Sequence, residues 1–396
     1  MEKPYPKRVW LFLCQIYSSQ NKIEILAQFY REKLDMASVM LTKEYDSEYN
    51  SNDTNNVDDA SHMVNSRLKY LPSNTTSINF STSSLKHFPD LAKFKYLQIT
   101  QLNCSVNRLT FIPSFPDNLL KLYCRSNNLT KLPTLPRGLR VLDCSMNELT
   151  ELPTLPDSLL VLEMEFNNVT QLPELPNTLE LLNCNWNNLT KLPILPDSLI
   201  ELSCNNIKTL QLSSLPINLE LLYCQESNLT SLPSLPTNLR KLYCCGNYLT
   251  ELPKLNHNLR ILHCNNNKLS RIPLINDKLE DLRCNNNKIV EIPPIKNLYF
   301  LQCENNLLIT LPLVDKLRSL DCDRNPICVL FHKNKSYEKC ATILNRFRYA
   351  FYTGKLRKWV WILKEKMAMA RYSPANLEAL LSQVEEDEFQ EVLDTW

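Results

Sequence analysis

The chain has 396 residues, a formal net charge of +2, 15 cysteines and only three glycines. A charge this close to zero implies no overall electrostatic attraction to nucleic acid or to a membrane surface. A phosphate-cradling loop needs several glycines close together, so three scattered glycines argue against such a loop.

The first 68 residues are expected to form two segments. Residues 1–42 carry apolar residues with a weak helical spacing and predict an N-terminal helical cap. Residues 43–68 are rich in Asn, Asp and Ser and predict a disordered linker. The short apolar run after Lys7 and Arg8 makes a poor signal peptide, and no stretch approaches the roughly twenty apolar residues that a membrane span needs.

Residues 69–326 contain a repeat with a period of about twenty residues, which is the signature of a solenoid. A representative unit is Leu119-x-x-Leu122-x-Cys124-x-x-Asn127-x-Leu129-Thr130-x-Leu132-Pro133-x-Leu135-Pro136. Leu122 and Cys124 are two positions apart, so both point to one side of a strand, which we place in the core. Tyr123 and Arg125 are then expected on the opposite, solvated side.

A cysteine occupies the same position in nearly every unit. The members of this column are Cys104, Cys124, Cys144, Cys184, Cys204, Cys224, Cys244, Cys264, Cys284, Cys303 and Cys322, with Met164 in one unit. Free cysteine packs well in an apolar column, and stacked parallel side chains have poor disulfide geometry. Close free thiols persist where thiols stay reduced, so the column predicts a cytoplasmic protein.

An asparagine usually follows three residues after the cysteine. This second column consists of Asn107, Asn127, Asn147, Asn167, Asn187, Asn247, Asn267, Asn287, Asn306 and Asn325. An amide side chain carries both a donor and an acceptor, so it can satisfy backbone groups where the chain turns after each strand. Ile207 and Ser227 interrupt the column, and we expect a local weakness there. The proline-rich remainder of each unit predicts an extended convex side without helix.

This pattern resembles the leucine-rich repeat family, and in particular the short, proline-rich class found in bacterial effectors and in giant-virus repeat proteins. With the degenerate Ile78-x-Phe80-x-x-Ser83-x-Leu85 as the first unit, about thirteen units follow one another and end at Cys322. The resemblance implies a repeat solenoid of the α/β class with a curved parallel β-sheet. For a viral member of this class, the predicted cytoplasm is that of the host cell. Solenoids generally bind partners on their concave strand face.

Residues 327–396 predict a C-terminal helical cap that ends in an acidic tail. Leu377, Leu380, Leu381 and Val384 give its last helix one apolar face. Terminal coils of a solenoid expose an apolar edge and need such a cap. The stretch also resembles the C-terminal part of mimivirus-type repeat proteins, a likeness that implies no function.

Three other kinds of site have weaker support. Some effector relatives carry a ubiquitin-ligase domain with a nucleophilic cysteine followed by an acid, but only about seventy residues follow the repeats here and Cys328 and Cys340 lack that acid. Zinc-ligand residue types occur at Cys322, Cys328, His332 and Cys340 without the usual Cys-x-x-Cys pair. Residues 346–371 mix basic and aromatic side chains that suit nucleic acid, although we favour a capping helix. We therefore predict no catalysis, no metal and no cofactor.

The concave strand face is the predicted functional surface, because its outward residues flank the cysteine column. The candidate partner-binding residues are Tyr123, Asp143, Glu163, Glu165, Phe166, Trp186, Tyr223, Tyr243 and His263. Exposed aromatic side chains are costly in water and are enriched in interface hot spots. The sequence therefore predicts a monomeric protein–protein interaction module with an unidentified protein partner. The alternatives are a substrate adaptor for a ubiquitin ligase and nucleic-acid binding by the basic C-terminal helix.

Overall fold

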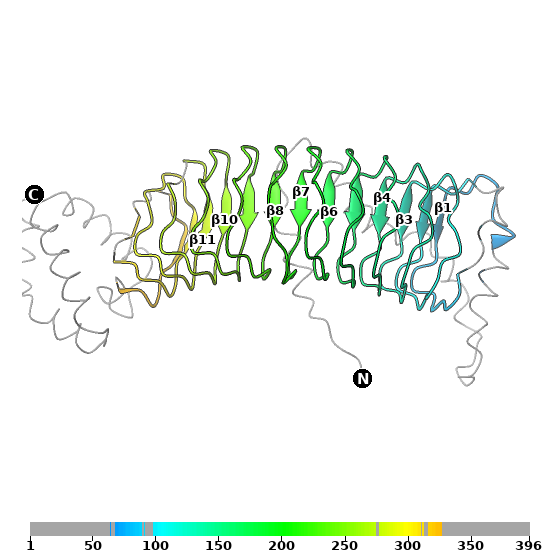
Figure 1. Ribbon diagram of the computed structural model, residues 1–396, viewed down its shortest axis with the longest axis horizontal. Helices are drawn as coiled ribbons and strands as arrows, with labels where there is room; N and C mark the ends of the chain where they lie inside the picture. Colours follow the sequence, from blue (N-terminus) through cyan, green and yellow to red (C-terminus); the bar gives the residue numbers. More distant parts are fainter. Residues whose placement is uncertain are drawn as a thin grey trace, which may run out of the picture.

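The computed structural model describes residues 64, 68–88, 91, 98–274, 277–309, 311–312 and 316–326. Within them the chain forms one elongated stack of coils, each contributing one short strand (Figure 1). The thirteen strands form a single parallel sheet in chain order, which confirms the predicted parallel solenoid. The predicted helical caps at 1–42 and 327–396, and nearly all of the predicted linker at 43–68, lie outside the described residues. The domain boundaries therefore stay predictions.

Every strand is three residues long, and successive strands are about one repeat apart. In chain order they are β1 (Ser77–Asn79), β2 (Gln101–Asn103), β3 (Lys121–Tyr123), β4 (Val141–Asp143), β5 (Val161–Glu163), β6 (Leu181–Asn183), β7 (Glu201–Ser203), β8 (Leu221–Tyr223), β9 (Lys241–Tyr243), β10 (Ile261–His263), β11 (Asp281–Arg283), β12 (Phe300–Gln302) and β13 (Ser319–Asp321). Their register pairs like with like, as in Leu122 with Leu142. Each repeat position therefore stacks on itself along the whole solenoid.

The core consists of the stacked leucines and cysteines that the repeat predicts. Leu122, Leu142 and Cys124 are fully buried, as is Met164 in the unit without a cysteine. The cysteines in the described part of the chain are all free thiols. Burial raises the pKa of Cys104 and Cys184 to about 12, with a backbone hydrogen bond opposing the rise in each case. These thiols are therefore protonated packing groups at neutral pH.

The buried asparagines connect neighbouring coils. Asn127 Nδ2 donates to the carbonyl oxygen of Cys124 in its own coil and to that of Cys104 in the preceding coil, both at 3.0 Å. Its Oδ1 accepts a hydrogen bond from the Leu109 amide at 3.0 Å. One side chain therefore satisfies three backbone groups at the turn after the strand, as the sequence predicts.

Ser227 takes over part of this role at the interruption of the asparagine column. Its hydroxyl donates to the Cys204 carbonyl oxygen at 2.9 Å and accepts from the Ile207 amide at 3.3 Å. Ile207 is fully buried, and its side chain contributes packing in place of the hydrogen bonds of an asparagine side chain. The local weakness expected at these two coils stays a prediction.

The residue two positions after each core cysteine or Met164 adopts a left-handed backbone conformation. Its φ is positive at Val106, Ser126, Met146, Phe166, Trp186, Asn206, Glu226, Gly246, Asn266, Asn286, Asn305 and Arg324. Glycine and asparagine adopt this conformation at little cost, whereas a bulky side chain is strained there. Consecutive coils thus place Phe166 (φ 55°) and Trp186 (φ 51°) where the backbone favours a small or amide side chain.

A tight turn closes each proline-rich return segment before the next strand. The Leu139 amide donates to the Pro136 carbonyl oxygen at 3.1 Å, and the Leu159 amide donates to that of Pro156 at 3.0 Å. These repeated turns set the entry of the chain into each strand. The extended convex course predicted for the rest of the return segment stays a prediction.

Candidate binding face

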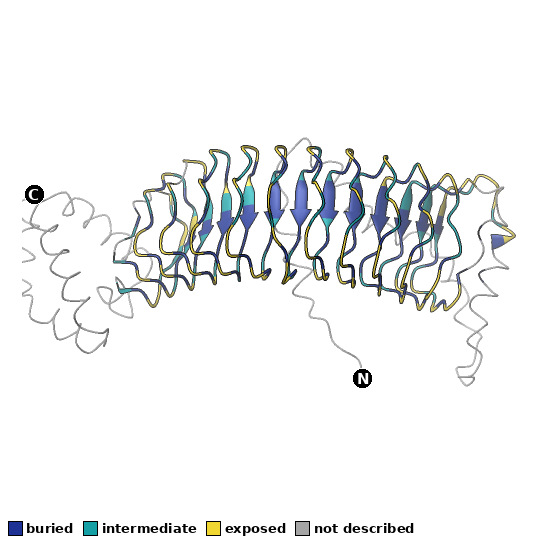
Figure 2. Ribbon diagram, in the orientation of Figure 1, coloured by how far each residue is buried: buried dark blue, intermediate teal, exposed yellow. Residues whose placement is uncertain are grey.

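The strand face is the outer surface formed by the first and third residues of each strand and by the residue after each core cysteine or Met164. Most of the sheet is buried (Figure 2). Five of the predicted partner-binding residues are buried on it, namely Tyr123, Asp143, Glu163, Tyr243 and His263. The expectation of a solvated outer face is therefore wrong at these positions. Glu165 and Tyr223 are partly exposed, while Phe166 and Trp186 are exposed.

A second apolar cluster on the strand face accounts for much of this burial. Tyr123 packs with Val141, Val161 and Leu181, apart from the main core. Parallel strands lie about 4.8 Å apart, so a long side chain covers the same position in the next coil. The signal in the sequence is an apolar residue directly before the core leucine, as in Val141-Leu142.

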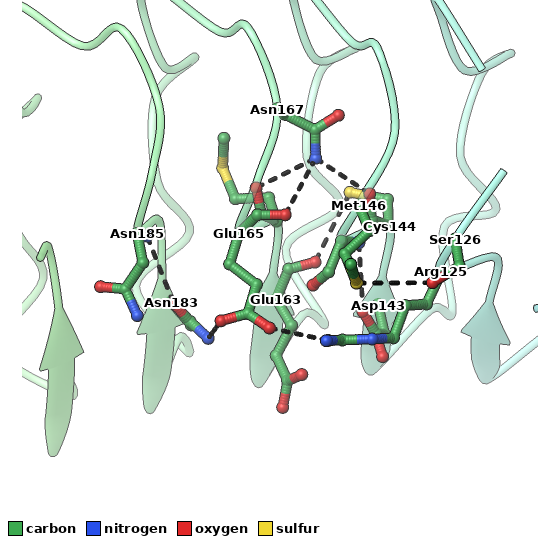
Figure 3. Close-up of polar contacts among 12 residues, drawn as sticks. Arg125, Ser126, Asp143, Cys144, Met146, Glu163, Glu165, Asn167, Asn183 and Asn185 are labelled. Carbon is green, nitrogen blue, oxygen red and sulfur yellow. Dashed lines mark hydrogen bonds and ion pairs between the residues drawn. The ribbon is translucent and has the colours of Figure 1, made fainter. Parts of the chain in front are cut away.

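A group of carboxylates with one arginine lies on β4 and β5 and beside them. Arg125 Nη1 donates to Glu165 Oε1 at 2.8 Å, and Asn183 Nδ2 donates to Glu165 Oε2 at 3.2 Å (Figure 3). Burial lowers the pKa of Arg125, but the charges of Asp143, Glu165 and Glu163 together raise it above its ordinary value. Arg125 is therefore a permanent cation held among three carboxylates.

Phe166 and Trp186 form a stacked pair at the edge of this group. Their ring centroids are 5.2 Å apart, the ring planes differ by 10°, and the residues are 41% and 49% exposed. An open hollow of about 340 Å³ adjoins both rings and is lined otherwise by asparagines, among them Asn168, Asn188 and Asn206. The pair thus offers apolar area beside amide groups that can hydrogen-bond to a partner's backbone.

The aromatic residues of β8–β10 form a different arrangement, because they interact with each other. Tyr223 and Tyr243 stack with centroids 4.7 Å apart, and His263 packs edge-on against Tyr243 at the same distance. His263 Nε2 lies 3.0 Å from Asp281 Oδ2, and Arg283 bonds the same carboxylate at 3.1 Å. Burial raises the pKa of Asp281, but these two partners lower it below its ordinary value. The predicted residues Tyr223, Tyr243 and His263 are therefore joined in one internal network.

Glu201, at the start of β7, is a candidate residue that was not predicted, because it does not lie next to a core cysteine. The residue is 6% exposed, and the register places it between Leu181 and Leu221. Its Oε2 atom has no hydrogen-bond partner among the described residues. Burial, and secondarily the charge of Glu163, raise the pKa of Glu201 to about 7, although Lys241 opposes the rise. The signal in the sequence is an acid at the first strand position between two coils that have leucine there, Leu181 and Leu221.

The alternative sites depend on residues that are mostly outside the described part of the chain. Cys328, His332, Cys340 and the basic segment 346–371 all lie there. Among the described residues, no group of three or more His, Cys, Asp or Glu side chains is placed to hold a metal ion. The same part of the chain has no helix that is long and apolar enough to cross a membrane. The zinc and nucleic-acid interpretations stay untested.

Comparison with known proteins gives likenesses to solved structures. No family model and no curated protein matches the sequence. YopM from Yersinia enterocolitica WA-314 is 31% identical with a TM-score of 0.56, over 64% of this chain and 60% of that chain. YopM from Yersinia pestis, a leucine-rich effector protein, is 26% identical with a TM-score of 0.43, over 62% and 88%. A leucine-rich repeat protein from Leptospira interrogans is 21% identical with a TM-score of 0.39, over 71% and 95%.

These likenesses concern the fold. The chain spans about 60% of the length of the Yersinia enterocolitica protein, and the similarity to it supports a leucine-rich repeat fold. The predicted likeness to the repeats of bacterial effectors is thereby confirmed for the solenoid. The likeness to giant-virus proteins stays a prediction.

Proposed function

We propose that this chain is a non-catalytic protein-binding module whose partner docks at the edge of the strand face between β4 and β7, where Phe166 and Trp186 lie. The observation that carries the proposal is the exposed, stacked pair of Phe166 and Trp186. Aromatic side chains of this kind are the residues that most often dominate binding energy at protein interfaces. The likeness to a YopM structure supports the proposal as a likeness of scaffold.

Backbone strain adds a second argument. A bulky residue in the left-handed region costs on the order of 1–3 kcal/mol. Other coils have Asn206, Gly246, Asn266 and Asn286 at the same position, but also Val106, Met146, Glu226 and Arg324. Backbone strain is commonly retained at binding sites, and at Phe166 and Trp186 it coincides with an exposed stack of two rings.

The ubiquitin-ligase adaptor and nucleic-acid interpretations would use the terminal segments. No observation among the described residues favours either of them. The protein-binding proposal depends only on residues 121–206, which the structure describes without a gap.

The test is affinity capture from cytosolic extract with the full chain and two variants. Trp186→Ala is expected to reduce capture of the specific partner at least fivefold, because it removes the central apolar contact. Phe111→Ala is the matched control, since Phe111 is equally exposed but lies in a return segment away from the strand face. If all three proteins capture the same partners in equal amounts, the proposal is wrong.

A further inference from the structure

Two hydrogen bonds connect each coil to the next at the turn after the strand. The amide that follows the core asparagine donates to a carbonyl oxygen of the preceding coil, as Asn188 does to Val169 at 3.0 Å. The side-chain oxygen of the core asparagine accepts from an amide of the preceding coil, as Asn187 does from Val169 at 3.0 Å. The same two bonds recur farther along at Leu249, whose carbonyl oxygen and amide bond the next coil at 2.9 and 3.0 Å.

Both bonds are missing on either side of β7, where Ile207 and Ser227 replace the core asparagine. Leu189 is fully buried, and no described residue accepts a hydrogen bond from its amide. Among the described residues, the amides of Lys208 and Asn228 also lack the bond to the preceding coil that their equivalents make elsewhere in the stack. A buried amide without an acceptor is costly, so the contact between the coils of β6 and β7 is weakened.

Nearby side chains restore only part of these connections. Thr209 Oγ1 donates to the Leu189 carbonyl oxygen at 2.9 Å, and Asn228 Nδ2 donates to that of Lys208 at 3.2 Å. The second of these bonds is exposed, where water competes for both groups. Neither bond provides an acceptor for the Leu189 amide.

The sheet is continuous through the same coils. The strands β6, β7 and β8 keep the common register, and Leu202 is fully buried in the core between Leu182 and Leu222. The coils around β7 are therefore held together along their strands, while bonds later in the turn are missing. A stack that is held along one side and loosely connected along another bends most easily about the held side.

The stability of a repeat array is approximately the sum of the stabilities of its coils and of the contacts between neighbours, so the weakest contact decides where the array divides. We propose that the two contacts on either side of β7 form a hinge, at which the solenoid bends and separates into two cooperative unfolding units. The N-terminal unit carries the exposed pair of Phe166 and Trp186, and the C-terminal unit carries the buried pair of Tyr243 and His263. Trp186 and Asn206 line one hollow from the two sides of the first contact, so bending changes the surface where we place the partner.

Hydrogen exchange at residue resolution tests the hinge on the full chain. The amides of Trp186 and Asn206 bond the next coil across the two contacts, at 2.9 and 2.8 Å. Met146 and Asn266 make the equivalent bonds away from β7, at 2.7 and 2.9 Å, and serve as the reference. We expect the amides of Trp186 and Asn206 to exchange roughly tenfold faster than the reference amides, corrected for intrinsic rates, because the hinge opens more often than the rest of the stack.

A double variant tests whether the missing asparagines cause the opening. Ile207→Asn with Ser227→Asn restores the core asparagine in both coils and supplies an acceptor for the Leu189 amide. Exchange at Trp186 and Asn206 should slow by roughly tenfold, to the rate of the reference amides. The two thermal unfolding transitions that we expect for the wild type should merge into one, because every contact in the stack then has the same bonds.

The matched control makes the same interruption in another part of the stack. Asn147→Ile with Asn167→Ser removes the core asparagine from two adjacent coils of the N-terminal half. Exchange should then become fast at Ser126 and Met146, whose amides bond the next coil at 2.9 and 2.7 Å. If this control does not fold, the comparison of the wild type with the restored variant decides the question by itself.

Three results would overturn the hinge. Equal exchange at Trp186, Asn206 and the reference amides would show that all coils are equally well connected. Unchanged exchange in the restored variant would show that the missing asparagines have no role, and a single unfolding transition in the wild type would remove the separate units. None of these results affects the proposed binding function, which depends on partner capture by Trp186→Ala and is lost or kept independently of the hinge.

Discussion

The surfaces at β4–β7 and at β8–β11 differ in how far their aromatic and polar side chains are joined to one another. In β8–β11, Tyr223, Tyr243 and His263 pack on each other and the histidine contacts Asp281, so the polar and aromatic groups are joined internally. Beside β5 and β6 the rings of Phe166 and Trp186 are exposed, and Glu201 in β7 has no hydrogen-bond partner at Oε2 among the described residues. Because the backbone of each coil is nearly the same, side chains alone distinguish the internally joined surface from the surface that we propose binds a partner.

The left-handed position shows the same contrast. In the C-terminal half it holds Asn266, Asn286 and Asn305, whose side chains form a ladder with bonds of 2.6 and 2.8 Å. In the N-terminal half it holds Val106, Ser126, Met146, Phe166 and Trp186, and the side chains of Phe166 and Trp186 stack on each other. An asparagine ladder suits this backbone better than two large rings do. The rings therefore have a cost that a function outside the chain would explain.

The largest expected effect tests the buried leucine core that both regions share. Leu182 in β6 and Leu262 in β10 are fully buried at the centre of their strands. Leu→Ala at either position should lower the free energy of unfolding by about 2–5 kcal/mol, because a cavity remains in the stack. Urea denaturation of both variants measures the loss. An unmoved midpoint at Leu182 alone would mean that the two halves do not have equivalent cores.

The next prediction separates the aromatic residues of the two regions. Tyr243→Ala should cost about 3 kcal/mol, since Tyr243 is buried between Tyr223 and His263. Trp186→Asn should change stability by less than about 1 kcal/mol, because relief of left-handed strain offsets the lost ring stacking. Thermal and urea midpoints of the two variants provide the comparison. Similar losses in both would show that Trp186 is a structural residue like Tyr243.

The smallest effect concerns pH. The pKa of Glu201 in the folded chain is about 7, above the ordinary 4.5, so the folded state holds this proton more tightly than the unfolded state does. Stability from this group is complete below pH 4.5 and is lost as the pH rises toward 7. Between pH 5 and pH 8 the wild type should lose about 2 kcal/mol relative to Glu201→Gln.

The control for this titration is Glu151→Gln, which alters an exposed acid in the same half of the chain. Its stability should follow the wild type at every pH. If Glu201→Gln also follows the wild type across this range, then Glu201 titrates like a solvated acid and its burial has no energetic consequence.

Much of the fold can be predicted from the sequence, because the same residue types recur at the same positions in successive repeats. The inward direction of Leu122 and Cys124, and the bridging role of Asn127, follow from a period of two in a strand and from amide chemistry. The candidate site is harder to predict from the sequence. Asp143 and Glu163 each lie next to a core residue in the sequence, which predicts that they are exposed contacts. Both are buried, because exposure depends on side chains in the preceding and following coils. The residues in contact are about twenty positions apart in the sequence, so a local sequence pattern does not show that they touch.

The sequence by itself therefore determined the parallel solenoid, the free-thiol core and the asparagine columns, since each depends on local periodicity and on the chemistry of one residue type. Only the tertiary structure decided which outward side chains are covered. It joined Tyr223, Tyr243, His263 and Asp281 into one network, and it placed Phe166 and Trp186 in strained, exposed positions. The physical reason is that burial and hydrogen bonding on the strand face arise between coils.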